Sequence, residues 1–366
     1  MSSSAAAPPR VDQHVLDDLR GRLRRFRQVS TATSPGWDRG VEPRYLSALM
    51  DYWAQTYDWR THEQRIRGLP WVSLNGGPTP IRAIHQRSTQ SATVVLLLHG
   101  WPDSVLRFEK LLPLLTDMTV VAPALPGFPF ALPVDGGGQS ATSMAESVAA
   151  AMRQLGHERY VVSAGDVGCD VAEALAAGHP QHVSALHLTD VSQYHFLVDP
   201  PTDLSAAEAE YMEYGRRWQA TEGGYMHEQS TKPQTIAAAL GDSPAGLAAW
   251  IVEKLRSWTD CRGDVETVFP RDDLLTWVTA YWVTGAIGTS FTPYAESGAK
   301  PWGRVQAPAA FTVFAHDLVN APREFAERFF TVRDWREYDH GGHFAAWECP
   351  REYADGIRRA VALGGD

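Results

Sequence analysis

Cysteine is scarce in this sequence. Its three cysteines, Cys169, Cys261 and Cys349, are far apart in a chain of 366 residues. An odd and widely spaced set excludes a disulfide framework and offers no metal-ligand spacing. Reduced thiols of this kind are typical of a cytoplasmic protein, and we expect that location.

Long apolar runs are also missing. No stretch approaches the roughly 18 consecutive apolar residues that a membrane span needs, and the first ten residues, MSSSAAAPPR, lack a hydrophobic signal region. A long basic run is absent too, with 33 Lys and Arg against 43 Asp and Glu and a formal net charge of -10. We therefore expect neither a membrane nor a nucleic acid as partner, and a small molecule instead.

What the chain does contain is a series of short apolar runs, as expected of strands buried on both faces of a sheet. Helical patterns separate the earlier runs, which predicts an α/β protein with a mostly parallel sheet and helices on both faces. Helical spacing also predicts two helices near the start, within 11–27 and 43–59. The five predicted strands lie in 94–98, 119–127, 159–165, 184–190 and 309–317.

The pattern changes between Asp190 and Ala309. This stretch is helical and rich in aromatic residues, as in TIAAALGDSPAGLAAWIVEKLRSW (235–258) and DDLLTWVTAYWVTGAIGTSF (272–291). Because it interrupts the alternation of strands and helices, we expect an inserted helical lid over the carboxyl edge of the sheet.

One turn places an aspartate in an unusual position. In VVSAGDVGCDVA (161–172), Asp166 lies at the tip of a strand-to-helix turn flanked by the small residues Ala164, Gly165 and Gly168. Small residues permit the sharp, strained reversal that exposes a catalytic nucleophile. An aspartate here is equally compatible with a helix cap, so this stretch alone leaves both interpretations open.

Partners for a nucleophile follow in the expected chain order of nucleophile, acid and histidine. Asp317 comes directly after the predicted strand 309–317, and His343 lies in a Gly-flanked loop near the C-terminus. Asp190, also at a strand end, is the rival acid. His340 lies three residues before His343, but without a nearby third ligand we expect no metal site.

Upstream, HGWPDS (99–104) directly follows the first buried strand. In this kind of turn, the backbone N–H groups of Trp101 and of Val167, the residue after the nucleophile, are expected to form an oxyanion hole.

Taken together, these motifs resemble those of epoxide hydrolases with the α/β-hydrolase fold, in the microsomal-type branch that carries an N-terminal extension. The resemblance covers nearly the whole chain. It implies an extension wrapping the core (1–90), a first core part (91–193), a lid (194–300) and a second core part (301–366). The segments that carry it are YWAQTYDWRTHEQRIRGLPWV, HGWPDSVLRFEKLLPLL, LPGFPFALP, STKPQTIAAALGDSPAGLAAWIVEKLRSWTD and GGHFAAWE.

Carried over motif by motif, the resemblance implies Asp166 as nucleophile, His343 as base and Asp317 as the acid that orients it. Tyr225 in GGYMHEQSTKP and Tyr294 in TSFTPY take the positions of two proton-donating tyrosines. Trp101 and Phe128, in the two loops that follow early strands, are expected to contact the substrate. A homodimer is expected by resemblance alone.

Two departures from the family pattern stand out. Val167 replaces the tryptophan that commonly follows the nucleophile, which predicts a differently shaped pocket floor, and in AHD (315–317) Ala-His stands before the acid Asp317 instead of a more usual Pro-Gly. The membrane-anchoring segment of eukaryotic relatives is absent from this sequence.

Chemistry supports an aspartate at this position. Serine attacking a saturated carbon would leave an ether, whereas aspartate leaves an ester that His343-activated water can cleave. Phenols are protonated at neutral pH and can donate to the opening ring oxygen. The expected activity is hydrolysis of an epoxide by water to a vicinal diol, with no cofactor.

Two alternatives remain open from the sequence. A haloalkane dehalogenase-type hydrolase shares the aspartate chemistry but needs side-chain N–H donors for the halide, and release of halide from a bromoalkane would favour it. A non-catalytic hydrolase-fold ligand-binding protein is the other, which tight binding without turnover would favour.

Overall fold

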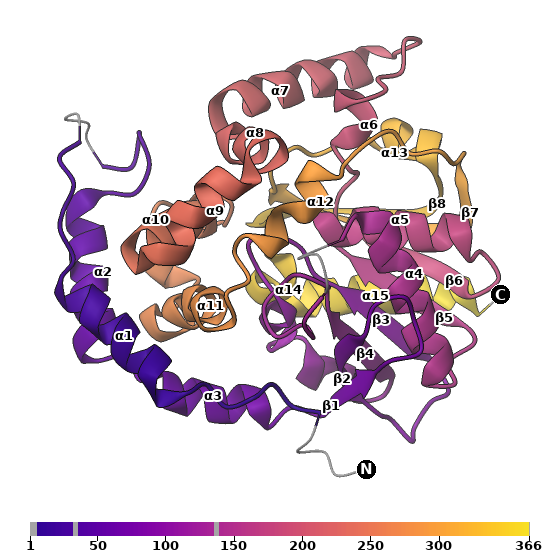
Figure 1. Ribbon diagram of the computed structural model, residues 1–366. Helices are drawn as coiled ribbons and strands as arrows, with labels where there is room; N and C mark the ends of the chain where they lie inside the picture. Colours follow the sequence, from indigo (N-terminus) through magenta and orange to yellow (C-terminus); the bar gives the residue numbers. More distant parts are fainter. Residues whose placement is uncertain (1–5, 32–35, 135–138, 366) are drawn as a thin grey trace.

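The central feature of the computed structural model is one sheet of eight strands (Figure 1). The structure describes residues 6–31, 36–134 and 139–365. The strands stand in the order β1-β2-β4-β3-β5-β6-β7-β8. Their bounds are β1 Trp71–Leu74, β2 Ile81–Gln86, β3 Val94–Leu98, β4 Thr119–Ala124, β5 Tyr160–Ala164, β6 Val183–Leu188, β7 Val305–His316 and β8 Phe330–Gly342.

Most neighbouring strands in this sheet are parallel. β3 pairs in parallel with β4 and β5, and the parallel pairing continues through β6, β7 and β8. Only β2 is antiparallel to its neighbours, β1 and β4. The predicted α/β class and mostly parallel sheet are therefore confirmed, and the five predicted strands correspond to β3 to β7.

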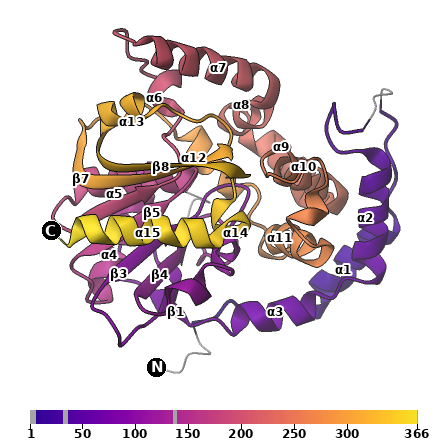
Figure 2. The ribbon, with the colours of Figure 1, turned by 180° about the vertical axis from the view of Figure 1, so that it is seen from behind.

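Helices cover both faces of the sheet, as predicted. α4 (Ala141–Gln154) and α5 (Val167–Gly178) lie on one face, and α15 (Pro350–Gly364) lies on the other (Figure 2). α15 approaches the sheet closely at Gly356, where a Cβ would lie 2.2 Å from His187 Nε2 and 2.4 Å from Thr312 Oγ1. The shorter helical segments of the core are η2 Val105–Phe108, η3 Leu112–Leu115, α13 Arg323–Phe329 and α14 Ala345–Glu348.

Between β6 and β7 the chain forms a layer of helices. Proline lies in the first turn of three of them, and a capping box between Ser205 and Glu208 starts α7. The segments are α6 Tyr194–Leu197, α7 Ala206–Glu222, α8 Gly224–Thr231, α9 Pro233–Asp242, α10 Pro244–Ser257, η4 Val265–Thr267, α11 Arg271–Thr284, η5 Thr289–Phe291 and α12 Thr292–Ala295.

Within the described residues, no single helix is long and apolar enough to span a membrane. α9 and α10 meet the criteria of length and hydropathy only when they are taken together, and the angle between them is 114°.

Three N-terminal helices form an arc around the outside of this layer (Figure 1). They are α1 (Gln13–Arg24), α2 (Pro43–Gln55) and α3 (Trp59–Arg67), and α1 and α2 confirm the predicted helical spacing. α1 and α2 contact α10, and α3 contacts α11. A buried hydrogen bond of 3.0 Å joins the Tyr57 hydroxyl to Thr276 Oγ1 of α11. The arc therefore helps to hold the inserted helices in place over the sheet.

Candidate active site

The turn between β5 and α5 has the strained backbone geometry that we predicted from its small residues, Ala164, Gly165 and Gly168. Asp166 has φ 57° and ψ -134°, in the left-handed region that non-glycine residues rarely adopt. The turn rests directly on the end of β3, since a Cβ on Gly168 would lie 2.5 Å from the Leu98 carbonyl oxygen. The Asp166 side chain makes no capping hydrogen bond to α5. Asp166 therefore stands at the tip of the turn without capping α5.

The Asp166 carboxylate lies among donors. The Trp101 backbone N–H donates to its Oδ1 at 2.7 Å, and His343 Nε2 lies 3.3 Å from its Oδ2. Burial by itself raises the pKa of Asp166, but His343 and the backbone N–H groups of Trp101 and Val167 outweigh it and hold the pKa below its usual value. The carboxylate is therefore ionised at neutral pH, and both predicted oxyanion donors adjoin it.

His343 is held on its other side by Asp317. Its Nδ1 lies 2.8 Å from Asp317 Oδ1, and both side chains are almost fully buried. Burial alone lowers the pKa of His343, but the Asp317 charge and the neighbouring Asp166 carboxylate outweigh it and raise the pKa to about 10. The imidazole is therefore protonated at neutral pH while Asp166 is ionised.

The rival acid, Asp190, has a different role in the geometry. Its Oδ1 accepts a hydrogen bond from the Asp166 backbone N–H at 3.3 Å and one from the Cys169 thiol at 2.6 Å. Burial, with the Asp317 charge as the second cause, raises the pKa of Asp190. Asp190 therefore holds the backbone of the turn at Asp166, and Asp317 is the carboxylate that contacts His343.

A buried ion pair that the sequence analysis missed joins the loops of this site. Arg107 Nη1 lies 2.7 Å from Asp103 Oδ2, and both side chains are buried. Asp103 Oδ1 accepts the Gly100 backbone N–H at 2.9 Å, and Arg107 Nη2 donates to the His343 carbonyl oxygen at 3.0 Å. The pair therefore fixes the Trp101 loop relative to the histidine loop. Its one signal in the sequence is an Asp and an Arg four residues apart.

Removal of Asp103 is expected to destabilise the protein strongly. The Asp103→Ala variant leaves the Arg107 charge buried without its partner, which costs about 3–5 kcal/mol of the free energy of unfolding. Denaturant unfolding measures this loss. Asp117→Ala is the control, because Asp117 and Arg358 form an ion pair that is more than two-fifths exposed, worth about 0–1 kcal/mol. Equal losses in the two variants would contradict this role of the buried pair.

Two tyrosines from the inserted helices face the same site. Tyr225 of α8 stacks on Trp101 with ring centroids 5.2 Å apart, and Tyr294 of α12 meets Tyr225 edge-on at 6.0 Å. Burial, followed by the Asp166 charge, raises the pKa of both phenols well above its usual value. The Tyr294 hydroxyl is buried without a hydrogen-bond partner in the described part of the chain. Both phenols are thus protonated and available as donors.

A cavity of about 210 Å³ joins these groups. Asp166, Val167, Asp317, Tyr225 and Tyr294 all line it. A third phenol that the sequence analysis missed, that of Tyr194 at the start of α6, also lines the cavity, and its buried hydroxyl has no partner among the described residues. In sequence, Tyr194 is one tyrosine among 12, without a motif to single it out.

Trp101 and Phe128, the two residues expected to contact the substrate, do not reach the cavity surface. Trp101 is fully buried behind Tyr225, and Phe128 packs edge-on against His99 with ring centroids 5.1 Å apart. Neither belongs to the residues that line the cavity. Trp101 positions the Tyr225 ring and supplies a backbone donor, while Phe128 supports the loop after β3.

Comparison with protein families gives two matches. The model described as "Epoxide hydrolase N terminus" matches residues 6–108, and the model described as "alpha/beta hydrolase fold" matches residues 93–222. A protein of Stigmatella aurantiaca named "Putative epoxide hydrolase" is 36% identical, over 95% of this chain and 82% of that protein. "Epoxide hydrolase 1" of Sus scrofa is 29% identical, over 95% of this chain and 86% of that protein.

Solved structures of epoxide hydrolases are similar over almost the full length. The juvenile hormone epoxide hydrolase of the silkworm Bombyx mori superimposes with a TM-score of 0.87 at 26% identity, covering 98% of this chain and 94% of that one. The Aspergillus niger epoxide hydrolase superimposes with a TM-score of 0.84 at 27% identity, covering 98% and 97%.

Proposed function

The chain belongs to the epoxide hydrolase family, and on that premise we propose that it opens epoxides through a covalent ester on Asp166. The observation that carries this proposal is the position of the Asp166 carboxylate. It contacts the Trp101 N–H and His343 on one side and faces the cavity that Tyr225 and Tyr294 line. A nucleophile and two acids therefore line one space, and the base contacts the nucleophile.

In the first step, an Asp166 oxygen attacks a ring carbon, and the bond from that carbon to the ring oxygen breaks. The electron pair stays on the oxygen, which takes a proton from Tyr225 or Tyr294. The attack neutralises the carboxylate, whose charge is one cause of the raised pKa of both phenols. The phenols therefore become stronger acids as the ring opens.

In the second step, the ester is hydrolysed. Because the Asp166 charge that favours the imidazolium is gone in the ester, the pKa of His343 falls, and its proton replaces the one given up by the phenol. Neutral His343 then takes a proton from water, which attacks the ester carbonyl carbon. The N–H groups of Trp101 and Val167 stabilise the oxyanion. The bond from this carbon to the diol oxygen then breaks, the oxygen takes the proton from His343, and the diol leaves. The Asp166 carboxyl gives its remaining proton to His343, which restores ionised Asp166 and protonated His343 without a cofactor.

The activity itself is tested with the purified chain and styrene oxide, as a simple aryl epoxide. We expect formation of the vicinal diol, detected by chromatography, and no halide from 1-bromobutane, because the phenols of Tyr225 and Tyr294 line the cavity together with Asp166. Halide release without diol would favour the dehalogenase alternative. Tight binding of the epoxide without product over hours would favour the ligand-binding alternative.

The two phenols are expected to share the role of acid. Tyr225→Phe and Tyr294→Phe each lower the rate of ester formation by about 10²-fold, because one of two donors to the ring oxygen is lost, and the double variant lowers it by up to about 10⁴-fold, because neither donor remains. Single-turnover consumption of styrene oxide measures these rates. Tyr211→Phe, which removes another buried phenol that lies outside this cavity, is the matched control. A double variant as fast as this control would contradict the assignment.

Two further expectations stay predictions. The excess of acidic residues and the reduced thiols favour a cytoplasmic protein without nucleic-acid or membrane partners. The homodimer is expected from the family resemblance alone.

A further inference from the structure

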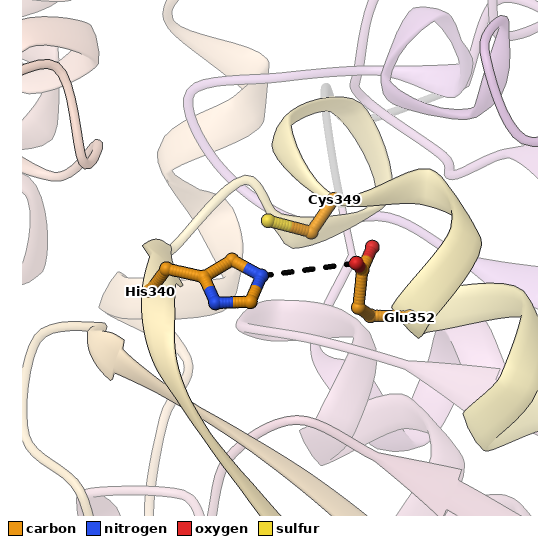
Figure 3. Close-up of side chains that lie close together, drawn as sticks. All are labelled: His340, Cys349 and Glu352. Carbon is orange, nitrogen blue, oxygen red and sulfur yellow. Dashed lines mark ion pairs between the residues drawn. The ribbon is translucent and has the colours of Figure 1, made fainter.

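A second group of reactive side chains lies outside the cavity, where β8 ends and α15 begins. His340 is on β8, Cys349 is the residue before α15, and Glu352 is in its first turn. Figure 3 shows the three side chains converging, with the Cys349 sulfur directed toward the space beside the His340 ring. One ligand atom of each lies within 4.8 Å of the other two. The proposed hydrolysis uses none of these residues.

The separation of the His340 and Glu352 ligand atoms suits a shared metal ion better than a hydrogen bond. His340 Nε2 and Glu352 Oε1 are 3.7 Å apart, which is too long for a hydrogen bond. Two ligands of a tetrahedral zinc ion, each about 2.1 Å from the metal, are about 3.5 Å apart. These two atoms therefore lie almost where zinc would need them.

The His340 ring is already oriented for such a site. Its Nδ1 lies 3.0 Å from Asp339 Oδ1, which leaves Nε2 directed toward Glu352 and Cys349. Histidines that bind metals almost always donate their second ring N–H to a carboxylate or carbonyl oxygen, and this contact fixes the tautomer and the ring orientation. The Asp339 contact is independent of the three candidate ligands.

The Cys349 thiol is seated against the strand by a glycine. A Cβ on Gly341 would lie 2.7 Å from the Cys349 sulfur, and Gly341 has φ 78°, so a larger residue here would displace the thiol and strain the backbone. The thiol is nearly buried, whereas the His340 and Glu352 side chains are 46% and 32% exposed. A metal ion can therefore enter from the solvent side, where water can occupy a fourth position.

We propose that His340 Nε2, Cys349 Sγ and a Glu352 carboxylate oxygen form a zinc site, with water as the fourth ligand. One nitrogen, one sulfur and one oxygen ligand match the donors that Zn²⁺ accepts. On binding, the thiol gives its proton to solvent, and the sulfur, which lies within 4.8 Å of the other two ligand atoms, moves closer to them. The ion ties β8 to α15 three residues from His343, so it stabilises the folded chain. The site does not depend on the proposed hydrolysis.

Cobalt replaces zinc as a spectroscopic probe in the test. The reduced, tag-free full chain is treated with a chelator and titrated with Co²⁺. We expect one equivalent to produce thiolate-to-cobalt charge-transfer absorption, which Zn²⁺ then abolishes by displacement. Cys349→Ser should lose this absorption, and Cys261→Ser, which removes another buried cysteine outside the group, should retain it. No absorption in the unmodified chain, or full absorption in Cys349→Ser, would overturn the proposal.

A second variant set remains informative if Cys349→Ser does not fold. His340→Gln replaces a side chain that is nearly half exposed, and it should lose the Zn²⁺-dependent rise in Tm that the unmodified chain shows. Asp339→Asn keeps all three ligands and should weaken Zn²⁺ binding about 10- to 100-fold, as expected for a residue that orients a ligand. Unchanged Zn²⁺ affinity in His340→Gln would contradict the site, and styrene oxide hydrolysis, measured in parallel, is a separate result.

Discussion

Asp166→Ala is expected to lower kcat for styrene oxide by about 10⁵- to 10⁶-fold, because alanine offers no atom that can form the ester. Alanine is preferable to asparagine, whose amide can hydrolyse back to the carboxylate. The turn itself should persist, since Asp190 accepts the backbone N–H of residue 166. Steady-state diol formation measures the loss.

The control for this loss is Asp117→Ala, which removes a carboxylate of an exposed ion pair outside the site. It should keep the activity of the unmodified chain. General base catalysis alone contributes about 10²- to 10⁴-fold to a rate. If Asp166→Ala retained more than about a hundredth of the activity, base-assisted attack of water on the ring would account for it, and this would contradict the ester.

His343→Gln should separate the two steps. Ester formation needs only the ionised carboxylate and the phenols, whereas ester hydrolysis needs a base. We therefore expect one equivalent of epoxide to be consumed and the ester to accumulate, with steady-state turnover lowered by about 10⁴-fold or more. Intact-protein mass spectrometry should show a gain equal to the mass of one epoxide molecule.

The matched control is the double variant Asp166→Ala with His343→Gln, which should gain no mass. A histidine variant that forms diol without a detectable adduct would contradict the two-step mechanism, because water would then reach the ring carbon without an ester. An adduct on the double variant would place the ester on another residue.

The core strands could be predicted from sequence because strands buried on both faces are continuous apolar runs. All five residues of β3 are buried. β8 was missed for the opposite reason. It lies at the edge of the sheet, and charged residues interrupt its sequence FTVRDWREYDHGG, several of them exposed. β1 has only four residues and pairs with β2 in a hairpin, and β2 mixes polar and apolar residues and is placed in the sheet by pairing with β4, more than 30 residues further along the chain.

The residues of the site could be found from chain order, but their pairing could not. Asp190 and Asp317 both follow parallel strands, so the sequence places both at the same edge of the sheet, and only the three-dimensional structure shows that Asp317 contacts His343. The Asp103–Arg107 pair and Tyr194 were missed because only their burial in the folded chain distinguishes them from other polar residues, and the sequence does not show that burial. The sequence also offered no third ligand near His340, because Cys349 and Glu352 approach it only when α15 packs beside β8.

The most direct test of the covalent ester on Asp166 is a single turnover in heavy-oxygen water with the enzyme in excess over styrene oxide. The ester mechanism predicts a diol that carries unlabelled oxygen from Asp166, while the label enters the peptide that contains this residue. Labelled oxygen in the diol of the first turnover, with none in that peptide, would contradict it.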